Sequence, residues 1–133
     1  MSGATPLLRA QATVLAVDDD PVSLRIIRSW LRKAGFARVL TCDDPRAVEG
    51  LIDAEGPQLL LLDLAMPGLD GFSLLEALAP RLAADRPLRV VVVTGHDHPA
   101  IIARAFDLGV RGILSKAATY DELVAVLDAA LGS

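Results

Sequence analysis

The sequence has one cysteine, few aromatic residues and no long apolar run. Cys42 is the single cysteine among 133 residues, so no disulfide can form within the chain, and a reducing compartment is expected. Aromatic residues make up only 4%, so the core must be aliphatic. No apolar run approaches the roughly 18 to 20 residues that a membrane span needs. We therefore expect a cytoplasmic protein that has no membrane as a partner.

Basic residues are also scarce relative to acidic ones. The formal net charge of −4 argues against a nucleic-acid-binding surface as the main function. The chain has two lysines, Lys33 and Lys116, and its other basic residues are arginines. Hydrophobic residues make up 53%, enough for the core of one domain. Residues 1–12 contain a single charge, Arg9, and are expected to form a loose tail before a domain over residues 13–131.

Short apolar runs alternate with amphipathic segments along the chain. The runs are apolar throughout, which is typical of strands in a parallel sheet covered on both faces. They are Thr13–Val17, Ala37–Thr41, Gln58–Leu62, Leu88–Val93 and Gly112–Leu114. Helices are predicted between them and after the last, at Pro21–Ala34, Pro45–Ala54, Gly71–Leu82 and Ala100–Leu108 and from Thr119 onward. This order predicts an α/β fold with a doubly wound, five-stranded parallel sheet.

Several residues mark the expected ends of these helices. Asp20 is a suitable N-cap for a helix that starts at Pro21, and Gly35 is a suitable stop. Thr119 and Glu122 have the spacing of a capping box before the last helix. Pro80 is expected to kink or end the third helix, because proline cannot donate the helical hydrogen bond.

Polar side chains follow the apolar runs at the carboxyl ends of four predicted strands. They are Asp18 and Asp19 after the first run, Asp63 after the third, Thr94 after the fourth and Lys116 after the fifth. The second run leads into Cys42 and Asp43 and is expected to be an edge strand. Ligand sites of open parallel sheets lie beyond the carboxyl ends of the strands, so we expect the first group to converge.

The three carboxylates are expected to share a divalent cation. Close negative charges repel one another, and a few carboxylates with water suit Mg²⁺. A solvated acidic turn would explain Asp20 as a helix cap, but it would not explain Asp18 or Asp19. A carboxylate such as Asp63 can also attack phosphorus and form an aspartyl phosphate, with Mg²⁺ offsetting the negative charge.

Thr94 and Lys116 have natural roles beside such an aspartate. The hydroxyl can donate a hydrogen bond to a phosphoryl oxygen, and the ammonium can pair with the carboxylate or the phosphoryl group. Taken alone, Thr94 would be an ordinary strand residue and Lys116 a surface charge. In a chain that otherwise favours arginine, a lysine at this strand end suggests a need for a compact point charge.

The chain resembles the receiver domain of two-component response regulators in four segments, in the family's order and spacing. The segments are Val14–Pro21 (VLAVDDDP), Leu60–Phe72 (LLLDLAMPGLDGF), Val91–Gly95 (VVVTG) and Gly112–Lys116 (GILSK). The resemblance covers residues from about 13 to 131, as a single domain. It implies a flavodoxin-like fold with strand order 2-1-3-4-5, and a phosphorylatable signalling domain that is not an enzyme.

The resemblance also implies roles for individual residues. Asp63 would accept a phosphoryl group from phosphohistidine on a histidine kinase or a histidine phosphotransfer protein, with Thr94 as the switch hydroxyl and Lys116 as the family's lysine. The implied Mg²⁺ ligands are Asp18, Asp19, Asp63 and the backbone carbonyl of Ala65. Phosphorylation would change a surface for a downstream protein, formed by the fourth helix, fifth strand and fifth helix of the alternating core.

The chain departs from many receiver domains at two positions, and two other readings stay open. Ile113 stands where many receivers have an aromatic switch residue, and Ala117 stands where many have proline. We also hypothesise that His96 affects hydrolysis of the phosphoryl group. One alternative is a hydrolase with Asp63 as nucleophile, but Ala65 occupies the position where such enzymes place a second aspartate. The other alternative is a receiver-like interaction module that works without phosphorylation.

Overall fold

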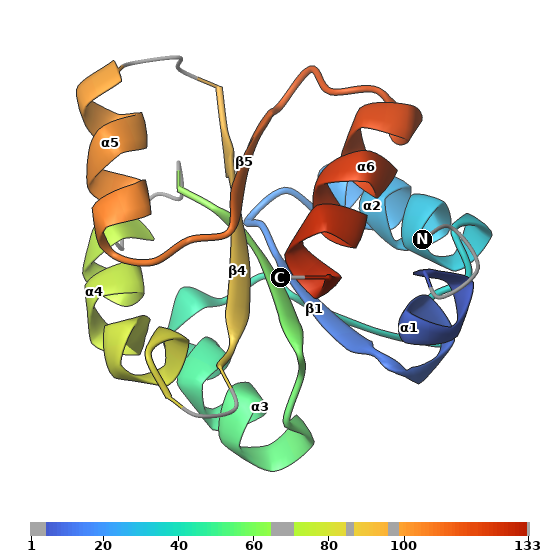
Figure 1. Ribbon diagram of the computed structural model, residues 1–133, viewed down its shortest axis with the longest axis horizontal. Coiled ribbons are helices and arrows are strands. Elements are labelled where there is room, and N and C mark those ends of the chain that lie inside the picture. The colour runs from blue at the N-terminus through green and yellow to red at the C-terminus, as the bar shows by residue number, and fades with distance from the viewer. Residues whose placement is uncertain (1–4, 65–70, 85–86, 96–98, 133) are drawn as a thin grey trace.

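The computed structural model describes residues 5–64, 71–84, 87–95 and 99–132, which form one sheet covered by helices on both faces (Figure 1). The strands are β1 (Thr13–Val17), β2 (Arg38–Cys42), β3 (Leu59–Asp63), β4 (Arg89–Thr94) and β5 (Gly112–Ser115). The helices are α1 (Thr5–Gln11), α2 (Pro21–Lys33), α3 (Val48–Glu55), α4 (Gly71–Leu82), α5 (Pro99–Asp107) and α6 (Tyr120–Leu131), with a 3₁₀ turn at Pro45–Ala47. Among the described helices, none combines the length and apolar character needed to cross a membrane.

The sheet confirms the predicted fold class and strand order. All neighbouring strands run parallel in the order β2-β1-β3-β4-β5, which is the flavodoxin-like order, and β2 lies at one edge. From β1 the chain passes to β2 on one side of β1, and from β2 it crosses back to β3 on the other side. The strand order therefore reverses between β1 and β3. Val17 of β1 pairs with Leu62 of β3, so the two carboxyl ends lie next to each other at this switch point.

Two aliphatic layers hold the helices onto the sheet. Helices α1, α2 and α6 cover one face, and α3, α4 and α5 cover the other (Figure 1). Successive strand side chains point to opposite faces, so Leu61 packs with the α2 and α6 layer while Leu60 and Leu62 pack with the α3, α4 and α5 layer. Strand residues that are apolar throughout can therefore bury every side chain, as the sequence predicts.

The predicted helix caps are present. The Asp20 carboxylate accepts a hydrogen bond from the Val22 N–H at 3.0 Å, and a cap of this kind contributes about 1 kcal/mol. Gly35 follows the end of α2 with φ +102°, a conformation that side chains with a Cβ rarely adopt. The capping box of Thr119 and Glu122 is formed in both directions. Local sequence signals therefore determine where these helices begin or end.

The structure differs from the sequence-based expectation in the N-terminal segment. A loose tail is predicted over residues 1–12, but Thr5–Gln11 form the helix α1. Its Arg9 side chain donates hydrogen bonds to both carboxylate oxygens of Asp128 in α6, at 2.8 and 2.5 Å, and to the Ala34 carbonyl after α2, at 2.9 Å. Because the partners lie far away in the sequence, no local pattern could reveal this contact.

The third predicted helix also continues beyond Pro80. Helix α4 extends to Leu82 with Pro80 inside it, so the proline lies two residues before the helix end. Leu75, Leu78 and Leu82 are buried on one side of this helix, and their burial keeps the last turn on the sheet despite the missing hydrogen-bond donor. The expectation that Pro80 ends this helix is wrong, because the helix continues through the proline to Leu82.

Candidate functional site

The site lies at the carboxyl ends of β1 and β3, where two aspartates meet. Asp18 directly follows β1 and Asp63 is the last residue of β3, next to each other in the register of the sheet. The Asp18 N–H donates to the Cys42 carbonyl at 3.2 Å, which fixes the backbone between β1 and β2. The Asp18 carboxylate in turn accepts from the Asp20 N–H at 3.0 Å. The turn that caps α2 therefore also orients Asp18.

Lys116 reaches this pair from the end of β5. Its Nζ lies 2.6 Å from Asp63 Oδ2 and 3.5 Å from Asp18 Oδ2. The Lys116 backbone N–H donates to the Thr94 carbonyl at 3.1 Å, so the ends of β4 and β5 are joined. Thr94 is buried, with 4% of its surface exposed. The predicted convergence of these residues at one end of the sheet is therefore observed.

Burial controls the charges of the site. The side chains of Asp18 and Asp63 are only 3% and 1% exposed, whereas that of Lys116 is 36% exposed. Burial, with the nearby Asp63 charge, raises the pKa of Asp18, although the Asp20 N–H and the Lys116 charge act in the opposite direction. Burial alone would lower the pKa of Lys116, but its hydrogen bond to Asp63 and the two carboxylate charges together raise it.

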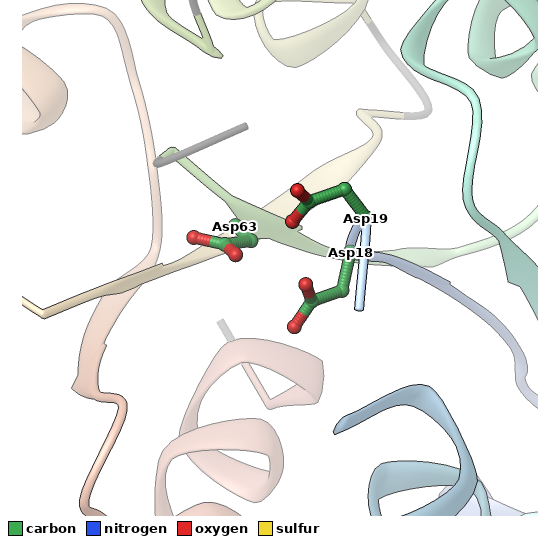
Figure 2. A group of neighbouring side chains, drawn as sticks. All are labelled: Asp18, Asp19 and Asp63. Atoms are coloured by element: carbon green, nitrogen blue, oxygen red, sulfur yellow. The ribbon is translucent and has the colours of Figure 1, made fainter. Parts of the chain in front are cut away.

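The three carboxylates form a group that fits a divalent cation. Asp18, Asp19 and Asp63 each offer an oxygen, and these oxygens lie within 4.8 Å of one another (Figure 2). Asp19 is exposed, so the group borders solvent on its side. An all-oxygen donor set with access to water is what Mg²⁺ prefers. Ala65, whose carbonyl the resemblance adds to this set, and His96 lie outside the described residues.

Gly71 contributes to the site through a close approach to the backbone. A Cβ added at Gly71 would lie 2.7 Å from Leu64 Cα and 2.8 Å from the Leu64 carbonyl oxygen. Since Leu64 directly follows Asp63, the start of α4 packs against the backbone that carries the central carboxylate. The sequence identifies this glycine only through the resemblance, because the partner of the contact becomes known only from the fold.

Sequence reasoning missed a cleft beside the carboxylates. This α2–α6 cleft has a volume of about 270 Å³ and reaches Asp18 and Lys116. Ile26 and Trp30 of α2 and Leu123 of α6 line its walls, and strand residues form its floor. Trp30 lies edge-on to Tyr120 of α6, with the ring centroids 6.0 Å apart. Because the lining residues come from several distant elements, no single sequence pattern marks the cleft.

Comparison with known proteins decides the family. The sequence matches the profile of the response regulator receiver domain over residues 14–128. This chain belongs to the response regulator receiver domain family. A receiver domain is a signalling module rather than an enzyme in the usual sense, and this one has an acidic pocket of Asp18, Asp19 and Asp63 with Lys116 beside it.

Individual relatives agree with this assignment. The receiver domain is 37% identical over 121 residues to the probable transcriptional regulatory protein NarL of Mycobacterium tuberculosis, covering 90% of this chain and 55% of that protein. It is 35% identical over 111 residues to the Regulator of RpoS of Escherichia coli, covering 84% of this chain and 31% of that protein. The chain therefore spans about half or less of the length of these relatives.

A solved structure confirms the fold at the level of coordinates. The signal receiver domain of NarL from Mycobacterium tuberculosis superimposes with a TM-score of 0.77 at 36% sequence identity. The superposition covers 92% of this receiver domain and 98% of that chain. The similarity therefore extends over nearly the whole of both domains.

Proposed function

We propose that this receiver domain is the phosphoacceptor of a two-component or phosphorelay system, with Asp63 as the phosphorylated residue. Receiver domains are typically phosphorylated by histidine kinases, and the proposed donor is the phosphohistidine of such a kinase or of a histidine phosphotransfer protein. The observation that carries the proposal is the buried Asp63 carboxylate, beside Asp18 and Asp19 and 2.6 Å from Lys116. The proposed location is the cytoplasm, with neither nucleic acid nor membrane as a direct partner.

In the proposed reaction, a carboxylate oxygen of Asp63 attacks the phosphorus atom of phosphohistidine. The new P–O bond forms as the P–N bond breaks. The electron pair of the P–N bond goes to the imidazole nitrogen, which takes up a proton, and the donor's side chain leaves as neutral histidine. Lys116 holds Asp63 before transfer and can pair with a phosphoryl oxygen afterwards. The hydroxyl of Thr94, at the end of β4, would donate a hydrogen bond to another phosphoryl oxygen.

Mg²⁺ is the proposed cofactor of this transfer. Its ligands would be the carboxylates of Asp18, Asp19 and Asp63, together with the backbone carbonyl of Ala65, which the resemblance implies. When bound, the ion supplies positive charge that reduces repulsion between the attacking carboxylate and the phosphoryl group. The raised pKa of Asp18 supports this assignment, because the buried carboxylate needs more positive charge than Lys116 provides.

The proposed output is a change in a surface that binds a downstream protein. A phosphoryl group at the strand ends would favour one of two arrangements of the face formed by α5, β5 and α6. Half-buried apolar residues lie on the elements of this face, among them Ile101 of α5 and Ile113 of β5. Because Ile113 stands where many receivers have an aromatic residue, the movement would not include the rotation of an aromatic ring.

Labelling with acetyl phosphate tests the proposal directly. The receiver domain is incubated with acetyl phosphate and Mg²⁺, and intact mass is measured at intervals. We expect a labile phosphoryl adduct that is absent in Asp63→Asn and that does not form when EDTA removes the metal before acetyl phosphate is added. Asp43→Asn is the matched control, because Asp43 follows the edge strand β2 at the same end of the sheet but is exposed and outside the carboxylate group.

The alternative function is that of an interaction module that works without phosphorylation. Ile113 and Ala117 favour it, since both replace residues that many phosphorylated receivers share. A folded wild-type protein that stays unlabelled under these conditions would support this alternative. Rapid release of phosphate from diverse monoesters would instead support a hydrolase.

A further inference from the structure

The chain leaves β5 through a tight turn that carries Lys116. The Lys116 N–H donates to the Thr94 carbonyl at 3.1 Å, which extends the contact between β4 and β5 by one residue. The Ala118 N–H then donates to the Ser115 carbonyl at 3.0 Å and closes a β-turn. Lys116 and Ala117 are the two central residues of this turn. The conformation of the turn therefore sets the point from which the lysine side chain starts.

The Ser115 side chain binds the N–H group that the turn itself does not use. A β-turn of this kind employs the N–H of its fourth residue, so the N–H of its third residue, Ala117, needs another acceptor. Ser115 Oγ accepts from the Ala117 N–H at 3.0 Å. Serine side chains form this contact with the backbone two residues further on. The hydroxyl therefore adds a second restraint on the backbone of Lys116 and Ala117.

Alanine at position 117 makes this restraint necessary. Many receiver domains have proline there, and a proline fixes its own φ and carries no N–H group. Ala117 has a free φ and an N–H that must be bound by water or protein. The Ser115 hydroxyl binds this N–H and limits the freedom of the turn. Serine therefore supplies here a restraint that alanine by itself does not provide.

The Lys116 ammonium depends on a well-placed backbone. It stands at the end of a flexible four-carbon stem, and the side chain is 36% exposed. Its Nζ nevertheless lies 2.6 Å from Asp63 Oδ2 and 3.5 Å from Asp18 Oδ2. Ser115 lines the α2–α6 cleft together with Lys116 and Asp18, so its hydroxyl belongs to the immediate surroundings of the site.

We propose that Ser115 is a positioning residue of the phosphoacceptor site. By binding the Ala117 N–H, its hydroxyl keeps the backbone of Lys116 where the ammonium reaches Asp63 and, after transfer, a phosphoryl oxygen. The inference rests on the proposed function and adds a residue that acts through the lysine. Small displacements of groups at a reaction centre cost large factors in rate, so loss of one hydrogen bond in the turn should be measurable.

The start of α6 does not account for the Ser115 hydroxyl. Thr119 and Glu122 form their own capping box there, in which the Thr119 N–H donates to the Glu122 carboxylate at 3.2 Å. The helix therefore begins through contacts that do not include Ser115. Its hydroxyl restrains the turn that precedes the cap, and this turn contains the lysine of the site.

A comparison of Ser115→Thr with Ser115→Val tests the proposal. The two variants have the same shape and both are β-branched, but only threonine keeps a hydroxyl that can accept from the Ala117 N–H. Ser115→Ala is a third variant without added bulk. Arg9→Gln is the control for general destabilisation, because Arg9 joins α1 to α6 away from the turn. Circular dichroism checks that each variant is folded under the assay conditions.

The first measurement is the rate of Asp63 labelling by acetyl phosphate and Mg²⁺, followed by intact mass. Ser115→Val and Ser115→Ala should be labelled about tenfold or more slowly than the wild type. Ser115→Thr and Arg9→Gln should keep a rate close to that of the wild type. Equal rates in the threonine and valine variants, or equal slowing in Arg9→Gln, would overturn the proposal.

The second measurement is specific to the lysine. Because the chain has two lysines, isotope-labelled lysine gives NMR signals from Lys33 and Lys116 alone, and Lys33 lies over the Tyr120 ring at 4.5 Å as an internal reference. In metal-free protein at constant pH, the Lys116 Cε resonance should shift in Ser115→Val and Ser115→Ala but not in Ser115→Thr, while that of Lys33 stays unchanged. An unmoved Lys116 resonance, or equal shifts of both lysines, would overturn the proposal.

The two measurements also separate this proposal from the proposed function. A folded wild-type protein that is never labelled would contradict Asp63 as the phosphoacceptor. In that case the Lys116 resonance would still decide whether the Ser115 hydroxyl positions the lysine, because the NMR measurement needs no phosphoryl donor.

Discussion

Replacing Gly71 with alanine should destabilise the domain, although alanine is the better helix former. The added Cβ would lie 2.7 Å from Leu64 Cα and 2.8 Å from its carbonyl oxygen, so backbone atoms must move apart. Overpacking of this kind costs about 1–3 kcal/mol, while the helix preference for alanine returns at most about 1 kcal/mol. The free energy of unfolding should therefore fall by about 1–2 kcal/mol.

Gly50→Ala is the matched control for this prediction. Gly50 lies in α3, is exposed, and a Cβ added there would meet nothing within 4 Å. The same chemical change should therefore raise the free energy of unfolding by about 0.5–1 kcal/mol. Urea unfolding of the two variants and the wild type, followed by circular dichroism, gives the two opposite signs directly.

The rate of phosphoryl labelling at Asp63 gives a second measure of the contact between Gly71 and Leu64. A shift of Leu64 would displace Asp63, its neighbour in the chain, and small displacements of a reacting group cost large factors in rate. Labelling by acetyl phosphate should slow about tenfold or more in Gly71→Ala and stay unchanged in Gly50→Ala. If both variants were stabilised equally and labelled at the wild-type rate, the close approach of α4 to Leu64 would be refuted as a constraint on the site.

Three further predictions concern charged residues. Lys116→Met should lower the free energy of unfolding at neutral pH in EDTA by about 1–3 kcal/mol, because the variant leaves the buried Asp63 carboxylate without the Lys116 ammonium. The partial exposure of Lys116 limits this loss. An unchanged free energy of unfolding would contradict a stabilising ion pair between the two residues. The raised pKa of Asp18 means that the protonated carboxyl contributes to stability below the ordinary pKa of 3.8, and that this contribution is lost as pH rises through the folded-state pKa. The free energy of unfolding of Asp18→Asn should therefore increase relative to that of the wild type as pH rises over this interval, as metal-free urea titrations would measure. A pH-independent difference would show that burial does not control this carboxyl. Arg9→Gln should cost about 1–2 kcal/mol, and a double-mutant cycle with Asp128→Asn should show coupling between the two residues, whereas additive losses would place α1 away from α6.

The strands and helix ends were the parts of the fold that local sequence could predict. Continuous apolar runs can be buried only in a sheet covered on both faces, and each observed strand begins or ends within one residue of its predicted run. Asp20 and Thr119 cap helices through hydrogen bonds to residues two or three positions away, so their signals are short and readable. The residues that the structure brings together were equally accessible, because Asp18 and Lys116 directly follow strands and Asp63 ends one.

The sequence by itself determined the alternating order of elements and the polar residues at the strand ends, since both depend on neighbours along the chain. Tertiary structure decided what depends on distant neighbours. It placed Lys116 against Asp63 and not merely near it, attached α1 to α6 through Arg9, and pressed Gly71 onto Leu64. It also left Arg25, Arg28 and Arg32 of α2 without ion pairs to any described residue. Sequence cannot show this, because ion pairing depends on which surfaces the fold brings together.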